Sequence, residues 1–408
     1  MTVASRLFLR AVPLAGAAAV AASAPAALAQ TAGVLPPGIV VTASIDVSHD
    51  SNVRRFGGSP YLTGSAADER ATPSIGVTIN KSLGRNSLTL DATAGYDFYR
   101  RNTQLNRERL GFGADLGLVG GPCVVHLRPT FSRQQSDLSE YIPIENGGRA
   151  SLNNTQQTQS YAGEVQCGDR YGLRPLILGT HAVGTNSLPQ RQISDYRTNT
   201  YGAGVAYGDP IYGEFALRAT RSDTDYPHRP ASFGNGTFSM RNISLDFDRS
   251  IGARLSGSVG VSYIMVRPSD PVVRDSNNFG WHVDLTATPT PDLQVAIGTS
   301  RNVTPSLGND SVYQINRSYR LNGSYAFNSR FQFSLAGSIS RTRYAGSIGY
   351  YGPIMSDATL HMLTGTLTLK ASNRLNYSLY GGYQDRNTNR SIYNYHSYFV
   401  GLRAALIL

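Results

Sequence analysis

The chain has 408 residues, of which 16% are charged and 40% hydrophobic, and its formal net charge is +10. Its mean hydropathy of −0.24, together with the lack of any apolar run of about 18 residues beyond residue 30, excludes a bundle of membrane helices. The 42 glycines and 24 tyrosines are spread without a break in composition, which favours one β-rich domain over several soluble domains.

The N-terminus has the features of a secretory signal peptide. Arg6 and Arg10 precede an Ala-rich apolar stretch, and Ala27-Leu28-Ala29 forms a small-x-small cleavage site. We therefore expect residues 1–29 to be a signal peptide and residues 30–38 a short periplasmic segment. In an exported chain, the basic excess favours lipopolysaccharide phosphates or an acidic polymer over nucleic acid as a partner.

From Ile39 onward, apolar and polar residues alternate. Val41, Ala43, Ile45 and Val47 share one face of a strand, and the intervening polar residues share the other. The pattern recurs to the last residue, so residues 39–408 are predicted to form a single antiparallel transmembrane β-barrel, all-β, with lipid outside and water inside. We place it in the bacterial outer membrane, in contact with outer-membrane lipid.

Short turns containing Gly, Asp, Asn or Pro alternate with longer polar segments and divide the barrel into about eighteen strands. Sixteen is the alternative, because residues 173–188 and 311–327 break the alternation. The second strand is predicted at Ser74–Asn80, after a polar loop over residues 50–70. Closure requires the strand that begins near Ile39 to pair with the strand that ends at Leu408. Residues 399–408 resemble the C-terminal signal read by the barrel-assembly machinery.

Charged residues on the polar parity are the functional candidates. They line a wet lumen either as structural ion pairs that brace the wall or as a mixed-charge lining that holds polar solutes weakly. The candidates in the lumen or its loops are Arg54, Arg101, Arg128, Arg218, Arg320, Asp46, Asp97 and Asp284.

No pattern of catalytic or metal-binding residues stands out. The seven histidines are scattered without metal-type spacing, and we interpret them as lumen-lining side chains. A barrel hydrolase would need a Ser-His pair and a third polar group on the lipid face, and no such group is evident. The sequence predicts a non-enzyme without cofactors.

The two cysteines are predicted to form a disulfide. Cys123 opens one strand of a hairpin and Cys167 closes the next, and both share parity with outward apolar residues. Opposed residues in neighbouring strands lie about 4.5–5.5 Å apart, which is within disulfide reach. The periplasm is oxidising, which favours pairing over two free thiols.

The stretch His49-Asp50-Ser51-Asn52-Val53-Arg54-Arg55, after the first strand, resembles the β-barrel porin 2 family of Gram-negative outer-membrane proteins. Several members of that family accompany exopolysaccharide or capsule export systems, including those of sphingan-type polymers. The resemblance implies a barrel that takes part in exopolysaccharide secretion, with the polymer and a periplasmic export complex as partners. The alternatives are a general diffusion porin for small polar solutes and a structural barrel.

Overall fold

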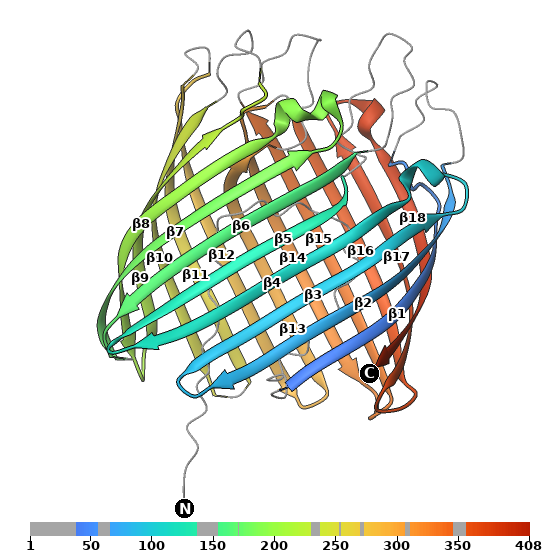
Figure 1. Ribbon diagram of the computed structural model, residues 1–408, viewed down its shortest axis with the longest axis horizontal. Helices are drawn as coiled ribbons and strands as arrows, with labels where there is room; N and C mark the ends of the chain where they lie inside the picture. Colours follow the sequence, from blue (N-terminus) through green and yellow to red (C-terminus); the bar gives the residue numbers. More distant parts are fainter. Residues whose placement is uncertain are drawn as a thin grey trace, which may run out of the picture.

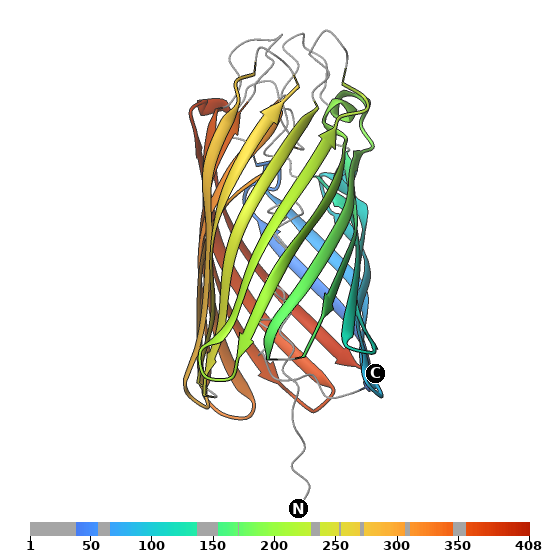
Figure 2. The same cartoon turned by 90° about the vertical axis from the view of Figure 1, so that its left-hand side faces the viewer.

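The computed structural model describes residues 38–55, 66–136, 154–169, 171–229, 237–252, 254–269, 273–306, 311–345 and 356–408. These residues form one 18-stranded antiparallel sheet that closes on itself. Figures 1 and 2 show a barrel of tilted strands with short turns at one end. By the strand bounds, the connections at the other end span more residues. Short turns mark the periplasmic end of such barrels and long loops the extracellular end. The predicted signal peptide and periplasmic segment lie outside the described residues, apart from Gly38.

The strands of the barrel follow one another in chain order. They are β1 (Gly38–Asp50), β2 (Asp68–Leu83), β3 (Asn86–Tyr99), β4 (Arg107–Gly120), β5 (Cys123–Gln135), β6 (Thr155–Cys167), β7 (Gly172–Asn186), β8 (Tyr196–Asp209), β9 (Gly213–Asp225), β10 (Phe238–Ile251), β11 (Leu255–Pro268), β12 (Ser276–Thr290), β13 (Leu293–Pro305), β14 (Tyr313–Ala326), β15 (Phe331–Ala345), β16 (Asp357–Lys370), β17 (Leu375–Thr388) and β18 (Tyr395–Ile407). Among the described residues, three short 3₁₀ helices lie in extracellular connections: η1 (Thr103–Leu105), η3 (Pro189–Ser194) and η5 (Ser391–Tyr393). No helix among the described residues is long and apolar enough to cross a membrane.

The first and last strands close the barrel. β1 pairs antiparallel with β18, from Thr42 opposite Ile407 to Asp50 opposite Phe399. Every strand therefore has two neighbours, and no edge of unpaired backbone groups faces lipid. The prediction of eighteen strands is confirmed, and the alternative of sixteen is wrong. The alternation of apolar and polar residues is interrupted in β7, because two of its inward residues are apolar. These residues, Leu176 and Leu178, are buried against Ala206 and Ala216.

The second strand is longer than predicted. β2 begins at Asp68 rather than Ser74, and it pairs with β1 along its length, from Asp50 opposite Asp68 to Gly38 opposite Asn80. Arg70, which was predicted in the preceding loop, and Thr72 thus belong to the strand. The prediction began the strand late because its first, extracellular third lacks large apolar residues.

The outer face carries exposed apolar side chains on alternate residues of each strand. Leu245, Ile297 and Leu335, for example, are exposed near the middle of their strands. Most exposed aromatic residues lie nearer the two ends, as in the interfacial girdles of membrane barrels. A closed barrel with this exterior is built to span the bacterial outer membrane, and the protein is an outer-membrane β-barrel.

Candidate functional site

The inner wall of the barrel is the candidate site, because its side chains alone face the aqueous route across the membrane. Polar and charged residues occupy the inward positions of most strands, opposite in parity to the exposed apolar residues. Acidic and basic side chains are interspersed around the wall from β1 to β14 and form local ion pairs.

The first cluster joins β1, β2, β3 and β4 in the extracellular half of the lumen. Arg70 Nη2 lies 3.6 Å from Asp46 Oδ1, and Arg70 Nε lies 4.0 Å from Asp97 Oδ1. Arg109 Nη1 lies 3.8 Å from Asp97, and the Thr72 hydroxyl donates to the same carboxylate at 2.6 Å. Two predicted residues, Asp46 and Asp97, are therefore brought together by an arginine that the prediction had placed in a loop.

Tyr380 completes this cluster from β17. Its hydroxyl donates to Asp46 at 2.8 Å to Oδ1 and 3.0 Å to Oδ2, across the intervening strand β18. The ring can lie flat against the wall because Gly401 on β18 is beneath it, where a Cβ would come within 2.4 Å of the ring. Tyr380 was not among the predicted site residues, although its parity in β17 is inward.

Further ion pairs continue around the wall. Arg128 Nε and His126 Nδ1 each lie 2.9 Å from the Asp115 carboxylate, and Arg218 Nη1 lies 2.7 Å from Asp246 Oδ2. Arg320 Nη2 lies 3.0 Å from Asp284 Oδ1 at mid-height, where these side chains are 53% and 41% exposed. Because both side chains point inward, that exposure shows that water reaches the middle of the lumen.

The wall formed by β15, β16 and the periplasmic part of β17 differs from the rest. Its inward side chains are mostly small and uncharged, and many are hydroxylated: Ser334, Ser338, Ser340, Thr364, Thr366, Thr368 and Ser378. The Thr368 and Ser378 hydroxyls lie 3.1 Å apart. A solute in the lumen thus meets ion pairs on most sides and a hydroxyl-lined strip on one side.

Two predicted charge candidates lie in extracellular connections instead of on the strand walls. The Arg54 Nε donates to Asn102 Oδ1 at 2.8 Å in a buried contact, and burial lowers the pKa of Arg54. Arg101 is exposed in the connection after β3, and its backbone N–H donates to Asp68 Oδ1 at 3.0 Å. Asp68 also accepts from the Asn102 backbone and side chain at 2.7 and 2.8 Å.

Residues 50–55, which we name the seam loop, bind the last strand to the first. The Ser51 N–H donates to the Tyr398 carbonyl at 2.9 Å, and Asn52 Nδ2 donates to the His396 carbonyl at 3.3 Å. Arg55 Nη2 lies 2.8 Å from Asp50 Oδ2. Ser51 and Asn52 therefore support closure of the barrel at its extracellular end, whereas Arg54 bonds Asn102 in the connection after β3.

The interpretation of all histidines as lumen-lining is wrong. Four of them share parity with exposed apolar residues at the extracellular ends of their strands and face outward: His49, His181, His361 and His396. His181 Nδ1 lies 2.7 Å from Asn199 Oδ1, but its register partners are Tyr161 and Asn199, so no serine stands opposite it. The residues that the structure describes contain no cluster of three potential metal ligands.

The cysteines face each other across the β5–β6 hairpin. They are register partners, their Cα atoms are 4.0 Å apart, and the structure joins them as a disulfide. The Gly168 N–H donates to the Pro122 carbonyl at 2.9 Å, so the cysteines occupy the adjacent non-hydrogen-bonded pair, where opposed residues approach most closely.

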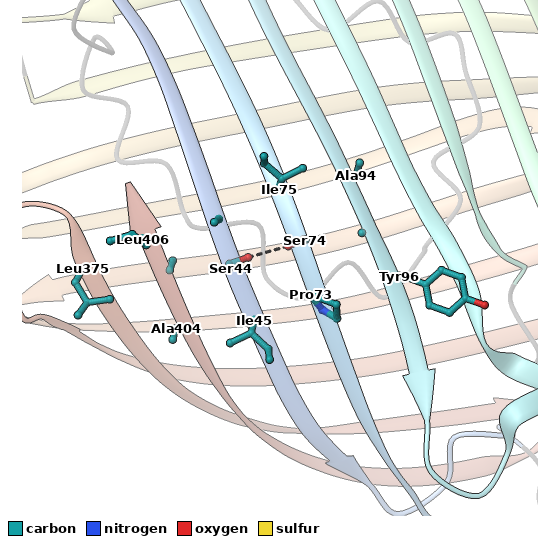
Figure 3. A pocket seen from close by; sticks show the side chains of 13 residues that line it. Ser44, Ile45, Pro73, Ser74, Ile75, Ala94, Tyr96, Leu375, Ala404 and Leu406 are labelled. Carbon is teal, nitrogen blue, oxygen red and sulfur yellow. Dashed lines mark hydrogen bonds between the residues drawn. The ribbon is translucent and has the colours of Figure 1, made fainter. Parts of the chain in front are cut away.

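An open groove of about 740 Å³ crosses the barrel seam. Figure 3 shows Ile45, Ile75, Tyr96 and Leu406 around it, with small residues such as Ala94 and Ala404 between the larger side chains. Because Ile45, Ile75, Tyr96 and Leu406 are exposed outward side chains, the groove faces lipid and is separate from the lumen.

No family model and no characterised protein sequence matches this chain. Among solved structures, OccK2 (OpdF) from Pseudomonas aeruginosa is 12% identical, with a TM-score of 0.47 and coverage of 91% of this chain and 97% of that one. A BenF-like porin from Pseudomonas fluorescens Pf-5 is 12% identical, with a TM-score of 0.45 and coverage of 91% and 98%. OccAB3 from Acinetobacter baumannii is 10% identical, with a TM-score of 0.43 and coverage of 91% and 99%. These values are below the level from which a shared function follows.

Proposed function

We propose that the barrel is a passive outer-membrane pore for polar solutes. The observation that carries this proposal is the water-exposed Asp284–Arg320 pair at mid-height, because a lumen filled by protein would bury both side chains. Ion pairs around the wall leave no strong field of one sign, so the pore should discriminate little between cations and anions.

Planar-bilayer recording of the purified protein tests this proposal. Stepwise, ion-conducting openings are expected, and Arg320→Glu shifts the ion selectivity towards cations because it changes the charge of the lumen. Arg241→Glu is the matched control, because Arg241 is exposed on the outer face of β10. This substitution makes the same charge change outside the lumen. A barrel without conductance, or equal selectivity shifts in both variants, contradicts the proposal.

A sugar polymer leaving the cell is the second candidate for the solute. Its support is the hydroxyl-lined, uncharged strip on β15–β17 beside Tyr380, since hydroxyls and aromatic faces suit sugars. The resemblance of residues 49–55, which include the seam loop, points the same way.

Deletion of the gene distinguishes the two candidates. Export of an exopolysaccharide requires secreted polymer to fall, with return of secretion on complementation by the wild-type chain. Unchanged polymer together with slower uptake of small polar solutes supports the diffusion pore and rejects export.

A further inference from the structure

Three arginines stand side by side on the outer face of the barrel. Arg301 on β13 lies directly opposite Arg317 on β14, which lies opposite Arg341 on β15. We name these residues the arginine row. They share parity with the exposed side chains of Ile297, Tyr319 and Ile339, so they point away from the lumen.

The arginine row lies at the level of the extracellular membrane interface. Trp281 is the register partner of Arg301, and the Cζ atoms of Arg301 and Arg317 lie 5.9 and 5.3 Å from the centroid of its ring. Exposed Phe279 and Tyr319 lie on the same face. Aromatic side chains of this kind mark the headgroup level of a membrane, and all these residues belong to the extracellular halves of their strands.

The row lacks the carboxylate partners that several other outward arginines have. Arg133 lies 2.8 Å from Glu108, Arg221 lies 3.0 Å from Asp223, and Arg100 lies 3.6 Å from Glu69. In the part of the chain that the structure describes, no carboxylate forms an ion pair with a member of the row. Directly opposed like charges destabilise a sheet. An anion from outside the chain would neutralise the three adjacent positive charges and stabilise this part of the barrel.

We propose that the arginine row binds the phosphate groups of a phosphorylated glycolipid of the outer leaflet, of the lipopolysaccharide class. Guanidinium groups form paired hydrogen bonds to phosphate and remain charged at the interface. The exposed apolar residues that follow towards the membrane centre, Ile297, Leu321 and Leu335, offer a surface for the acyl chains of the same molecule. This site is independent of whether the lumen conducts.

Binding of bisphosphorylated lipid A to the purified, detergent-solubilised barrel tests the proposal. In Arg317→Ala/Arg341→Ala, we expect affinity to fall about tenfold or more, as for the loss of two charge-assisted contacts. Arg133→Ala/Arg221→Ala is the matched control, because it removes two outward arginines that have carboxylate partners. Its affinity for bisphosphorylated lipid A should stay within about twofold of the wild-type value.

A second measurement separates a binding defect from a folding defect. Bisphosphorylated lipid A should raise the thermal unfolding temperature of the wild-type barrel, and dephosphorylated lipid A should not. Equal binding by the wild type and the row variant, equal losses in the row and control variants, or equal stabilisation by both lipids would overturn the proposal.

Discussion

At the scale of single residues, inward glycines allow larger neighbours to lie flat against the lumen wall. Gly401 lies beneath Tyr380, and a Cβ on Gly298 would meet Asp284 Oδ1 at 2.6 Å and Arg320 Nε at 3.2 Å. The same relation holds at Gly260, between Asp246 and His282. These side chains therefore make their ion pairs and hydrogen bonds along the wall, which leaves the centre of the lumen open.

Gly401→Ala tests this arrangement. The new Cβ displaces the Tyr380 ring and removes its hydrogen bonds to Asp46, so we expect the free energy of unfolding in lipid vesicles to fall by about 1–3 kcal/mol. In a Tyr380→Ala background the same substitution should have little effect, because no ring remains to be displaced. If the two effects simply add, Tyr380 does not depend on Gly401.

At the scale of elements, the extracellular connections hold the barrel seam and its neighbours together. Asp68 and Asn102 are each 1% exposed, and Arg54 is 8% exposed. Their hydrogen bonds link the seam loop to β2 and to the connection after β3. Because these polar groups are buried, loss of one partner leaves the others unsatisfied, at greater cost than the loss of a surface hydrogen bond.

Asn102→Ala is therefore expected to reduce the free energy of unfolding by about 1–3 kcal/mol. Asn387→Ala is the control, since Asn387 is an exposed asparagine at the extracellular end of β17 that bonds Asp385, and it should change stability by less than about 0.5 kcal/mol. Denaturant titration in lipid vesicles measures both, and similar values would show that the buried contacts contribute little.

The disulfide between Cys123 and Cys167 joins the two strands of the β5–β6 hairpin. Thiol titration of the unreduced, denatured protein should find no free thiol, whereas two per chain would rule the bridge out. Because the bridge closes a loop with a sequence separation of 44, Cys123→Ser/Cys167→Ser should lower the free energy of unfolding by about 2–4 kcal/mol.

Alternation predicted the strands because one face of each strand meets lipid and the other meets water. Towards the extracellular ends of the strands that contrast weakens, and the prediction did not extend the alternation to His49, His181, His361 and His396, although their parity with the apolar residues of their strands places them on the outer face. Seam-loop contacts such as Asn52 to His396 join residues 344 positions apart and depend on closure. The arginine row likewise requires the registers of β13, β14 and β15, which the sequence pattern does not specify.

At the scale of the whole molecule, the two main features are the closure of the barrel and its polar inner face. The pairing of β1 with β18 satisfies the backbone in lipid, and inward ion pairs with outward apolar residues separate a hydrated lumen from the membrane. Of two adjacent residues in one strand, one must therefore face water and the other lipid. This difference allows a direct test of the claim that the lumen is hydrated.

That test is the modification of single cysteines during bilayer recording. Ser338 and Ile339 are neighbours on β15, with inward and outward parity respectively, and the two native cysteines are joined as a disulfide. A charged, water-soluble thiol reagent should reduce the conductance of Ser338→Cys and leave that of Ile339→Cys unchanged. A channel blocked through Ile339→Cys but not through Ser338→Cys, or insensitive at both positions, would contradict a hydrated lumen on this face.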